Sequence, residues 1–574
     1  MPTTPTPTPP ADPRTAAAVD ALARDVWEAG LEESPIWCTF LGDPRGADRL
    51  DERGPAARAR RHARTQAFQQ RLRALPRLPA TDEAGLTQRV LERHLAEALE
   101  EPTHRLWQLD VDQLFGPHLL LAQVLSLQPV GDPAALGAVV ARLQGTGAWF
   151  AAWEADVREG VEAGRLPARV AVERVLGQLK AMAAAAPEAS PLAQPLARLP
   201  ATTSAADRAQ AAARVHAAIA QVVAPALARM AAFLEREVLP HARTQPGLCH
   251  VEGGAEAYRW RLRSQTTTEL TAQQVHDIGR EELAGNLREI EAIARSERHV
   301  GDVRSFLAAL GKDARFRLAT REQILARYRD ICARMQARLP EAFGILPRRP
   351  FAVQPIEAYA EKDAPAAYYR PGPDSRPDPG VFYANTRDPE TWPTYDFEAL
   401  CFHEAVPGHH LQVALAQELA GLPALRRHGG FTAYVEGWAH YTERLADEMG
   451  MYSTPYDRVG MLTAQAWRAA RLVVDTGLHA LGWSREQAVD LLDSIRGGSP
   501  DDVRNEVDRY IVWPGQALSY KIGSRTITEV RARAKARLGA RFTLAGFHDE
   551  VLRHGALPLS LLEEVLERWE PAAR

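Results

Sequence analysis

Apolar residues recur at intervals of three and four along most of residues 15–245, with polar and charged residues between them. The segment RVLERHLAEALEE (89–101) and the alanine-rich run at 206–240 show this spacing clearly. It places the apolar side chains on one face of a helix, which can then bury that face against its neighbours. Proline and glycine separate these segments, and none of them has a strand-like pattern. The sequence therefore predicts a mostly α fold.

Strand-like content is concentrated at residues 349–386. The runs FAVQPIEAY (351–359), AAYYR (366–370) and VFYANT (381–386) are rich in β-branched and aromatic residues, and prolines and glycines separate them. They predict a small antiparallel sheet whose exposed edge could accept an extended peptide as an additional strand. The backbone of VFYANT and the side chain of Asn385 are then candidate substrate contacts.

Composition limits the partners that this chain can have. Its 574 residues include 69 Lys+Arg and 73 Asp+Glu, for a net charge of -4. This balance offers no basic surface for nucleic acid or for an anionic membrane. Proline and threonine alternate in residues 1–14, which predicts a disordered tail, and no apolar run is long enough to span a bilayer. We expect a cytoplasmic protein without nucleic-acid or membrane partners; the sequence does not indicate its oligomeric state.

The stretch CFHEAVPGHHLQ begins like the His-Glu-x-x-His helix of zinc peptidases, with His403 and Glu404. In that helix two histidines four residues apart reach one ion, and the glutamate acts as general base toward water. Here Pro407 occupies the position of the second histidine. Proline has no N–H, and its ring clashes with the carbonyl of His403, so a regular helix cannot continue through it.

A kink or bulge with two residues looped out would bring His409 to the position of the second ligand. His410 is the competing ligand. A third ligand is available in TAYVEGWAHY (432–441), where apolar and aromatic neighbours make an unpaired Glu436 costly to bury. His440 follows one turn later on the same face and is predicted to support a ligand or to contact substrate.

The alternative interpretation is that these histidines pack in a core while the glutamate caps a helix or forms a salt bridge. A lone His-Glu pair would favour that alternative. The combination of HE, GHH and EGWAHY favours a metal site within the helices at about 397–449.

The strings HEAVPGHHLQ, YVEGWAHY and YIVWPGQALSYKIG resemble the bacterial family labelled domain of unknown function eight-eight-five, which is placed among gluzincin-type metallopeptidases. The similarity covers most of residues 15–570. The chain is also distantly similar to helical zinc carboxypeptidases and angiotensin-converting enzyme, whose Gly-His pair supplies the second ligand and so favours His409 over His410. The resemblance implies one zinc ion per chain in a two-lobed, zinc-peptidase-like fold. Its deep central cleft would lie between an N-terminal lobe (15–245) and a catalytic lobe (246–574).

Hydrolysis of a peptide produces an oxyanion that needs a hydrogen-bond donor besides zinc. Tyr520 is the first candidate and His479 the second, because related zinc peptidases use tyrosine and histidine late in the chain. Three basic residues near these motifs are candidates to bind a terminal carboxylate of the substrate: Arg471, Lys521 and Arg525.

We therefore expect a zinc-dependent peptidase that hydrolyses short peptides, like a carboxypeptidase or dipeptidase, with Glu404 as general base. A metal-dependent hydrolase of a non-peptide amide or ester is one alternative. A non-catalytic peptide-binding relative is another.

Overall fold

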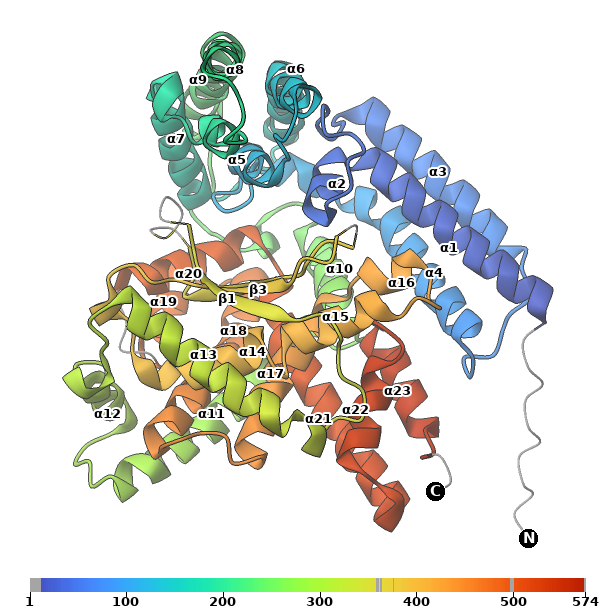
Figure 1. Ribbon diagram of the computed structural model, residues 1–574, viewed down its shortest axis with the longest axis vertical. Helices are drawn as coiled ribbons and strands as arrows, with labels where there is room; N and C mark the ends of the chain where they lie inside the picture. Colours follow the sequence, from blue (N-terminus) through green and yellow to red (C-terminus); the bar gives the residue numbers. More distant parts are fainter. Residues whose placement is uncertain (1–11, 358–360, 362–363, 375, 496–499, 572–574) are drawn as a thin grey trace. The chain divides into compact units, whose positions relative to one another are not determined.

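The computed structural model describes residues 12–357, 361, 364–374, 376–495 and 500–571 (Figure 1). Most of these residues are helical, which confirms the mostly α prediction. The predicted tail at 1–14 lies outside the described residues as far as residue 11, and the first helix already begins at Pro13.

The chain groups into two compact units. Unit 2 comprises residues 24–74 and 94–257, and unit 1 contains the rest of the described chain. Three helices are divided between the units: α1 (Pro13–Glu33), α4 (Glu83–Glu100) and α10 (Gly254–Thr266). The other helices of unit 2 are α2 (Pro35–Leu41), α3 (Pro55–Arg73), α5 (Pro117–Leu127), α6 (Pro133–Glu162), α7 (Arg169–Ala184), α8 (Ala205–Ala218) and α9 (Ala224–Phe233).

Unit 1 holds a small sheet and the remaining helices. Its strands are β1 (Phe351–Pro355), β2 (Ala367–Arg370) and β3 (Gly380–Ala384). Helices before and around the sheet are α11 (Ala272–Ser296), α12 (Val303–Leu310), α13 (Arg321–Arg338), α14 (Phe397–Glu404), α15 (His409–Glu418) and α16 (Ala424–His428). The later helices are α17 (Thr432–Glu448), α18 (Pro455–His479), α19 (Arg485–Asp493), α20 (Pro500–Val512), α21 (Ser519–Leu538), α22 (Leu544–Leu552) and α23 (Leu559–Arg568).

Unit 2 contains a segment that meets the length and hydropathy of a membrane-spanning helix. It runs over Ala205–Val238, because π-helical turns join α8 to α9 and extend α9. The sequence analysis expected no segment long and apolar enough to span a bilayer, and by length and hydropathy that expectation is wrong. Half of the window is buried inside the protein, and Val215, Val223 and Leu227 belong to the core around Trp153. These contacts are typical of a core helix in a globular unit.

The sheet differs from the predicted antiparallel arrangement. Its strand order is β1-β3-β2, with β1 parallel and β2 antiparallel to β3. The run VFYANT supplies the central strand, whose five residues are all buried, as expected for a strand covered on both faces. Its backbone is paired on both sides, so it cannot accept a peptide; the free edges belong to β1 and β2.

Glycines allow α17 and α21 to pack closely. A Cβ on Gly523 would lie 1.9 Å from the carbonyl oxygen of Ala433, and one on Gly437 would lie 2.5 Å from the Cα of Gly523. The backbones therefore touch where they cross. This contact places Tyr520 and the residue after it, at the start of α21, beside the middle of α17.

Unit 1 also includes two segments from the N-terminal part of the sequence, residues 12–23 and 75–93. The second is fastened by Arg426, whose buried guanidinium contacts the Glu83 carboxylate at 3.2 Å and the Thr87 hydroxyl at 3.1 Å. The sequence analysis placed the boundary between the lobes at residue 245, whereas the structure groups residues 75–93 with unit 1. This grouping involves ion pairs between residues far apart in the sequence, such as Glu83 and Arg426.

Candidate metal centre

The helix that begins the metal motif stops where the proline requires it to stop. Helix α14 ends at Glu404 and α15 begins at His409, so four residues link two separate helices. We expected a kink or bulge within one helix, and the structure instead has two helices joined by a short link. Gly408 allows the chain to turn here, since a Cβ at this position would lie 1.9 Å from the carbonyl oxygen of His403.

This link brings three metal-binding groups together. Nε2 of His403 lies 3.6 Å from Oε2 of Glu436, and Nε2 of His409 lies 3.4 Å from the same oxygen. One ligand atom from each residue lies within 4.8 Å of the other two. The predicted trio from α14, α15 and α17 is thus assembled in one place.

His410 points elsewhere. Its Nδ1 lies 3.1 Å from the hydroxyl of Tyr369 on β2, and its ring packs 4.6 Å from that of Phe351 on β1. Burial lowers its pKa to about 4, so the ring is neutral. Between the two neighbouring histidines, His409 faces Glu436 and His410 fastens α15 to the sheet.

The histidines and the glutamate of the cluster shift one another's pKa values. Burial opposes protonation of His403, but the carboxylates of Glu436 and Glu443 outweigh it and raise the pKa of His403 to about 9. Burial also opposes charge on Glu436, yet the two imidazoles hold the pKa of this carboxyl well below its usual value. Oε2 of Glu436 is buried and accepts no hydrogen bond from the described residues. A divalent cation could replace the His403 proton as the partner of this anionic oxygen.

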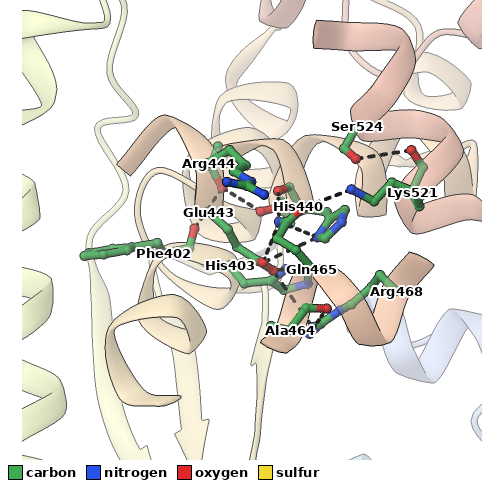
Figure 2. Close-up of polar contacts among 12 residues, drawn as sticks. Phe402, His403, His440, Glu443, Arg444, Ala464, Gln465, Arg468, Lys521 and Ser524 are labelled. Carbon is green, nitrogen blue, oxygen red and sulfur yellow. Dashed lines mark hydrogen bonds and ion pairs between the residues drawn. The ribbon is translucent and has the colours of Figure 1, made fainter. Parts of the chain in front are cut away.

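Glu443, which the sequence analysis missed, orients His403 (Figure 2). Its Oε1 lies 2.8 Å from Nδ1 of His403, so the Nδ1 proton is donated to the carboxylate and Nε2 faces Glu436. Oε2 of Glu443 accepts a 2.9 Å bond from the amide of Gln465, whose carbonyl accepts a 3.0 Å bond from Nζ of Lys521. The spacing in the sequence could have identified Glu443, because it follows Glu436 by seven residues and so lies on the same face of α17.

His440 is fully buried on the same face. Its Nδ1 lies 3.1 Å from the Gln465 amide nitrogen and 3.4 Å from Oε2 of Glu443. Burial lowers its pKa to about 3, so the ring is neutral. Nε2 has no hydrogen-bond partner among the described residues. His440 therefore packs beside Glu443 and Gln465, one turn from Glu436.

Glu404 is held by the free edge of the sheet. Its Oε2 accepts a 2.9 Å hydrogen bond from the backbone N–H of Tyr369, which points away from β3. The predicted general base thus lies at the end of α14, next to His403 and against an unpaired strand edge.

Of the two predicted oxyanion donors, only Tyr520 lies beside the cluster. Its ring is 6.4 Å from that of His403 and nearly parallel to it. His479 instead stacks on Tyr258 at 5.2 Å, and its Nε2 lies 2.9 Å from the carbonyl oxygen of Tyr510. These contacts assign His479 to packing at the end of α18.

The predicted substrate anchor Asn385 is occupied by the chain itself. Its amide donates to the carbonyl of Glu361 at 2.7 Å, and its Oδ1 accepts from the N–H of Arg387. It is buried and fastens the loop before β2. The sequence could not reveal this, because the carbonyls it binds lie in an irregular loop.

The three predicted basic residues have different environments. Lys521 contacts Glu282 at 3.2 Å, and burial lowers its pKa. Arg525 contacts the same glutamate at 3.8 Å and Glu529 at 2.7 Å. Arg471 lies over the ring of Tyr520, with its guanidinium carbon 4.6 Å from the centre of that ring.

The residues fit a zinc ion. Two imidazoles and one carboxylate form a known zinc donor set, and two ligand atoms that are each ~2.1 Å from a tetrahedral ion lie about 3.4 Å apart. The separations of 3.6 and 3.4 Å from Oε2 of Glu436 match that spacing. The fold and the site therefore define a mostly helical protein with a partly buried His-His-Glu cluster suited to a divalent metal.

The chain belongs to the family described as bacterial protein of unknown function (DUF885), which it matches over residues 35–566. It has no match among curated proteins. It is similar to the crystal structure of a protein from Colwellia psychrerythraea described as a candidate lipoprotein. That pair has a TM-score of 0.91 and 27% identity, over 97% of this chain and 98% of the other.

A candidate lipoprotein of unknown function from Shewanella oneidensis shares the fold. The TM-score is 0.73 and the identity 20%, over 96% of this chain and 99% of that one.

Proposed function

We propose that this protein is a zinc-dependent metallopeptidase that hydrolyses short peptides. The spacing of His403 and His409 around Oε2 of Glu436, a buried oxygen that accepts no hydrogen bond from the described residues, carries this proposal. The proposal includes a relationship of this chain to gluzincin-type metallopeptidases and to their two-lobed fold. The helical scaffold and the His-Glu start of the motif support that likeness.

Zinc at this site would polarise the peptide carbonyl and make a water molecule more acidic. Glu404 acts as the general base, and the N–H of Tyr369 fixes one of its carboxylate oxygens. Tyr520, whose ring lies beside that of His403, is the candidate donor to the developing oxyanion.

The variant Glu404→Gln tests the general base. The amide occupies the same space but cannot accept a proton, so we expect the protein to keep its zinc and to lose ~10²–10⁴-fold in kcat. Elemental analysis measures the metal content, and a library of short peptides measures the turnover. Full hydrolysis by this variant would contradict the assignment.

The same library separates the alternative functions. Zinc binding with hydrolysis of esters or non-peptide amides alone would support the broader hydrolase. Peptide binding without turnover by the wild-type protein would support a non-catalytic relative.

Location is a separate part of the proposal. The two solved structures named above are described as candidate lipoproteins, which favours the cell envelope over the expected cytoplasm. Fractionation of cells, with detection of the native protein in envelope and cytoplasmic fractions, tests this directly.

A further inference from the structure

Arg471 is the centre of a buried set of polar side chains that has no role in the proposed hydrolysis. The residue is 7% exposed and lies on α18. Its Nε donates a 3.0 Å bond to the Tyr510 hydroxyl, and its Nη2 donates a 2.7 Å bond to Glu506; both partners lie on α20. These two bonds fix the plane of the guanidinium.

The third nitrogen, Nη1, is buried and has no hydrogen-bond partner among the described residues. A buried guanidinium nitrogen without an acceptor is costly, and in native proteins such an atom needs an explanation. A ligand that supplies an anionic acceptor would remove this cost.

The local charges favour an anion. Glu506 contacts two arginines, Arg471 at 2.7 Å and Arg509 at 3.5 Å. Burial opposes charge on Glu506, but the two arginines outweigh it and lower its pKa to about 2. Burial raises the pKa of Tyr510 well above its usual value, so this hydroxyl stays neutral. One carboxylate thus faces two guanidinium groups, which leaves one positive charge in excess.

Arg471 also lies at a useful distance from the metal cluster. Tyr520 contacts both groups: its ring centre lies 4.6 Å from the Arg471 guanidinium carbon and 6.4 Å from the centre of the His403 ring. These distances place the guanidinium carbon at most 11.0 Å from the centre of the His403 ring. A peptide extends at most ~3.3–3.6 Å per residue, so no more than about three residues span this distance, and one or two residues fall within that limit.

The other two basic candidates do not have these features. Lys521 and Arg525 both contact the carboxylate of Glu282, and Arg525 also contacts Glu529 at 2.7 Å. Two carboxylates therefore face these two cations, and their charge is already balanced within the protein. Arg471 alone among the three combines a fixed guanidinium, an unpartnered nitrogen and an excess of positive charge.

We propose that Arg471 binds the free C-terminal carboxylate of the substrate, so that the protein removes one or two residues from the carboxyl end of short peptides. This inference rests on the proposed peptidase function and deepens it by naming the substrate class. The fixed guanidinium gives a directional, charge-assisted grip on a carboxylate. A C-terminal amide or a longer extension beyond the cleaved bond forfeits that grip.

The first experiment changes only the substrate. Wild-type, zinc-loaded protein is given short peptides as free acids, as C-terminal amides, and as free acids whose cleavable bond lies far from the C-terminus. We expect kcat/KM for the free acids cleaved near their end to exceed that for the amides by at least ~10-fold. Equal rates for acids and amides would overturn the inference and leave the peptidase function standing.

The second experiment measures binding without turnover, in the Glu404→Gln background. An N-acetylated alanine dipeptide and its amide are titrated by calorimetry. We expect the acid to bind at least ~10-fold more tightly, and Arg471→Lys to abolish most of this preference because lysine cannot keep the fork geometry. Arg509→Lys is the matched control, since Arg509 shares Glu506 but donates to Gln516, and it should keep the preference.

The two experiments separate failure of the inference from failure of the function. A preference for the acid that Arg471→Lys leaves intact would overturn the inference, because another group then holds the carboxylate. Acid-selective binding that depends on Arg471, in a protein that cleaves no peptide, would support the subsite and overturn the peptidase function.

Discussion

His403 has two ring nitrogens, and the structure gives them different partners. Nε2 faces the carboxylate of Glu436, while Nδ1 is bound to the carboxylate of Glu443. The second contact determines which nitrogen of a neutral ring carries its lone pair. Metal affinity should therefore depend on a residue that does not itself touch the metal.

The variant Glu443→Gln tests this dependence. It keeps the size of the side chain but removes the charge that holds the His403 proton on Nδ1. We expect zinc affinity to fall by ~10–100-fold, measured by competition with a chelator of known affinity. Glu448→Gln, on the same helix but paired with Arg531 at the surface, should leave affinity unchanged. Equal affinities for the two variants would contradict the role of Glu443.

Asp475 is a buried carboxyl whose charge state should affect stability. It accepts a 2.6 Å bond from the Tyr258 hydroxyl and bonds of 3.1 Å from the Gly515 N–H. Burial raises its pKa to about 7, and these bonds offset only part of that effect. Between about pH 4 and 7 the folded state holds this proton and the unfolded state does not, so its contribution to stability falls as pH rises through that window.

The variant Asp475→Asn removes this titration. The unfolding free energy of the wild type relative to the variant should decrease by roughly 3 kcal/mol between pH 5 and pH 8, because each pKa unit corresponds to about 1.4 kcal/mol. Urea denaturation at the two pH values measures the difference. A constant difference between the proteins would show that the Asp475 pKa is not raised.

Residue patterns predicted the members of the His-His-Glu cluster better than they predicted the surroundings of the cluster. His403 and Glu436 could be chosen from the sequence, because HE and EGWAHY place polar groups in apolar settings. The choice of His409 over His410 came from resemblance, and the structure shows its cause: Tyr369 binds His410 on the sheet side. Asn385 was mistaken for a substrate contact, since its partners are loop carbonyls that no spacing rule identifies.

At the level of elements, the crossing of α17 and α21 sets the geometry of the site. Helix α17 carries Glu436, His440 and Glu443, and α21 begins with Tyr520 and Lys521. The two helices can approach this closely only because glycines face each other at the crossing. Any side chain there would separate the helices and widen the site.

We expect Gly523→Ala to cost at least ~2 kcal/mol, because its Cβ would lie 1.9 Å from a backbone oxygen of α17. Zinc affinity should fall as well, since Glu436 moves with that helix. Gly285→Ala in α11 is the control, because its Cβ would approach only Arg288 at 3.8 Å. That change should be neutral or stabilise the helix by ~0.5–1 kcal/mol. Urea denaturation compares them, and equal stabilities would contradict the close crossing.

Helix periodicity was a reliable guide to elements, and strand pairing was not. The apolar spacing of three and four predicted the mostly helical fold, and Pro407 correctly located a break after Glu404. The form of the break, two helices with a four-residue link, depends on how Gly408 packs against the His403 carbonyl. The mixed sheet was missed because pairing partners depend on the path of the connecting loops, which local composition does not encode.

At the level of the whole molecule, all three candidate ligands belong to unit 1, although they come from three helices. A metal that binds only the folded arrangement stabilises that unit by mass action. At free zinc 100 times its Kd, the gain is about 2.7 kcal/mol.

Added zinc should therefore raise the melting temperature of the metal-free protein, and a chelator should reverse the change. Differential scanning calorimetry measures both. Glu436→Gln should melt at the same temperature with and without zinc, because the anionic oxygen is lost. A zinc-dependent rise in this variant would indicate that zinc acts at another site.

The grouping of residues 75–93 with unit 1 has a consequence for synthesis on the ribosome. Glu83 meets its partner Arg426 only after another 343 residues have been added. At ~5–20 residues per second, this takes roughly 17–70 s. During that interval all of unit 2 has been made, while the Glu83 carboxylate and the Thr87 hydroxyl still lack their partner Arg426. This part of α4 can therefore reach its final contacts only after α16 has been synthesised.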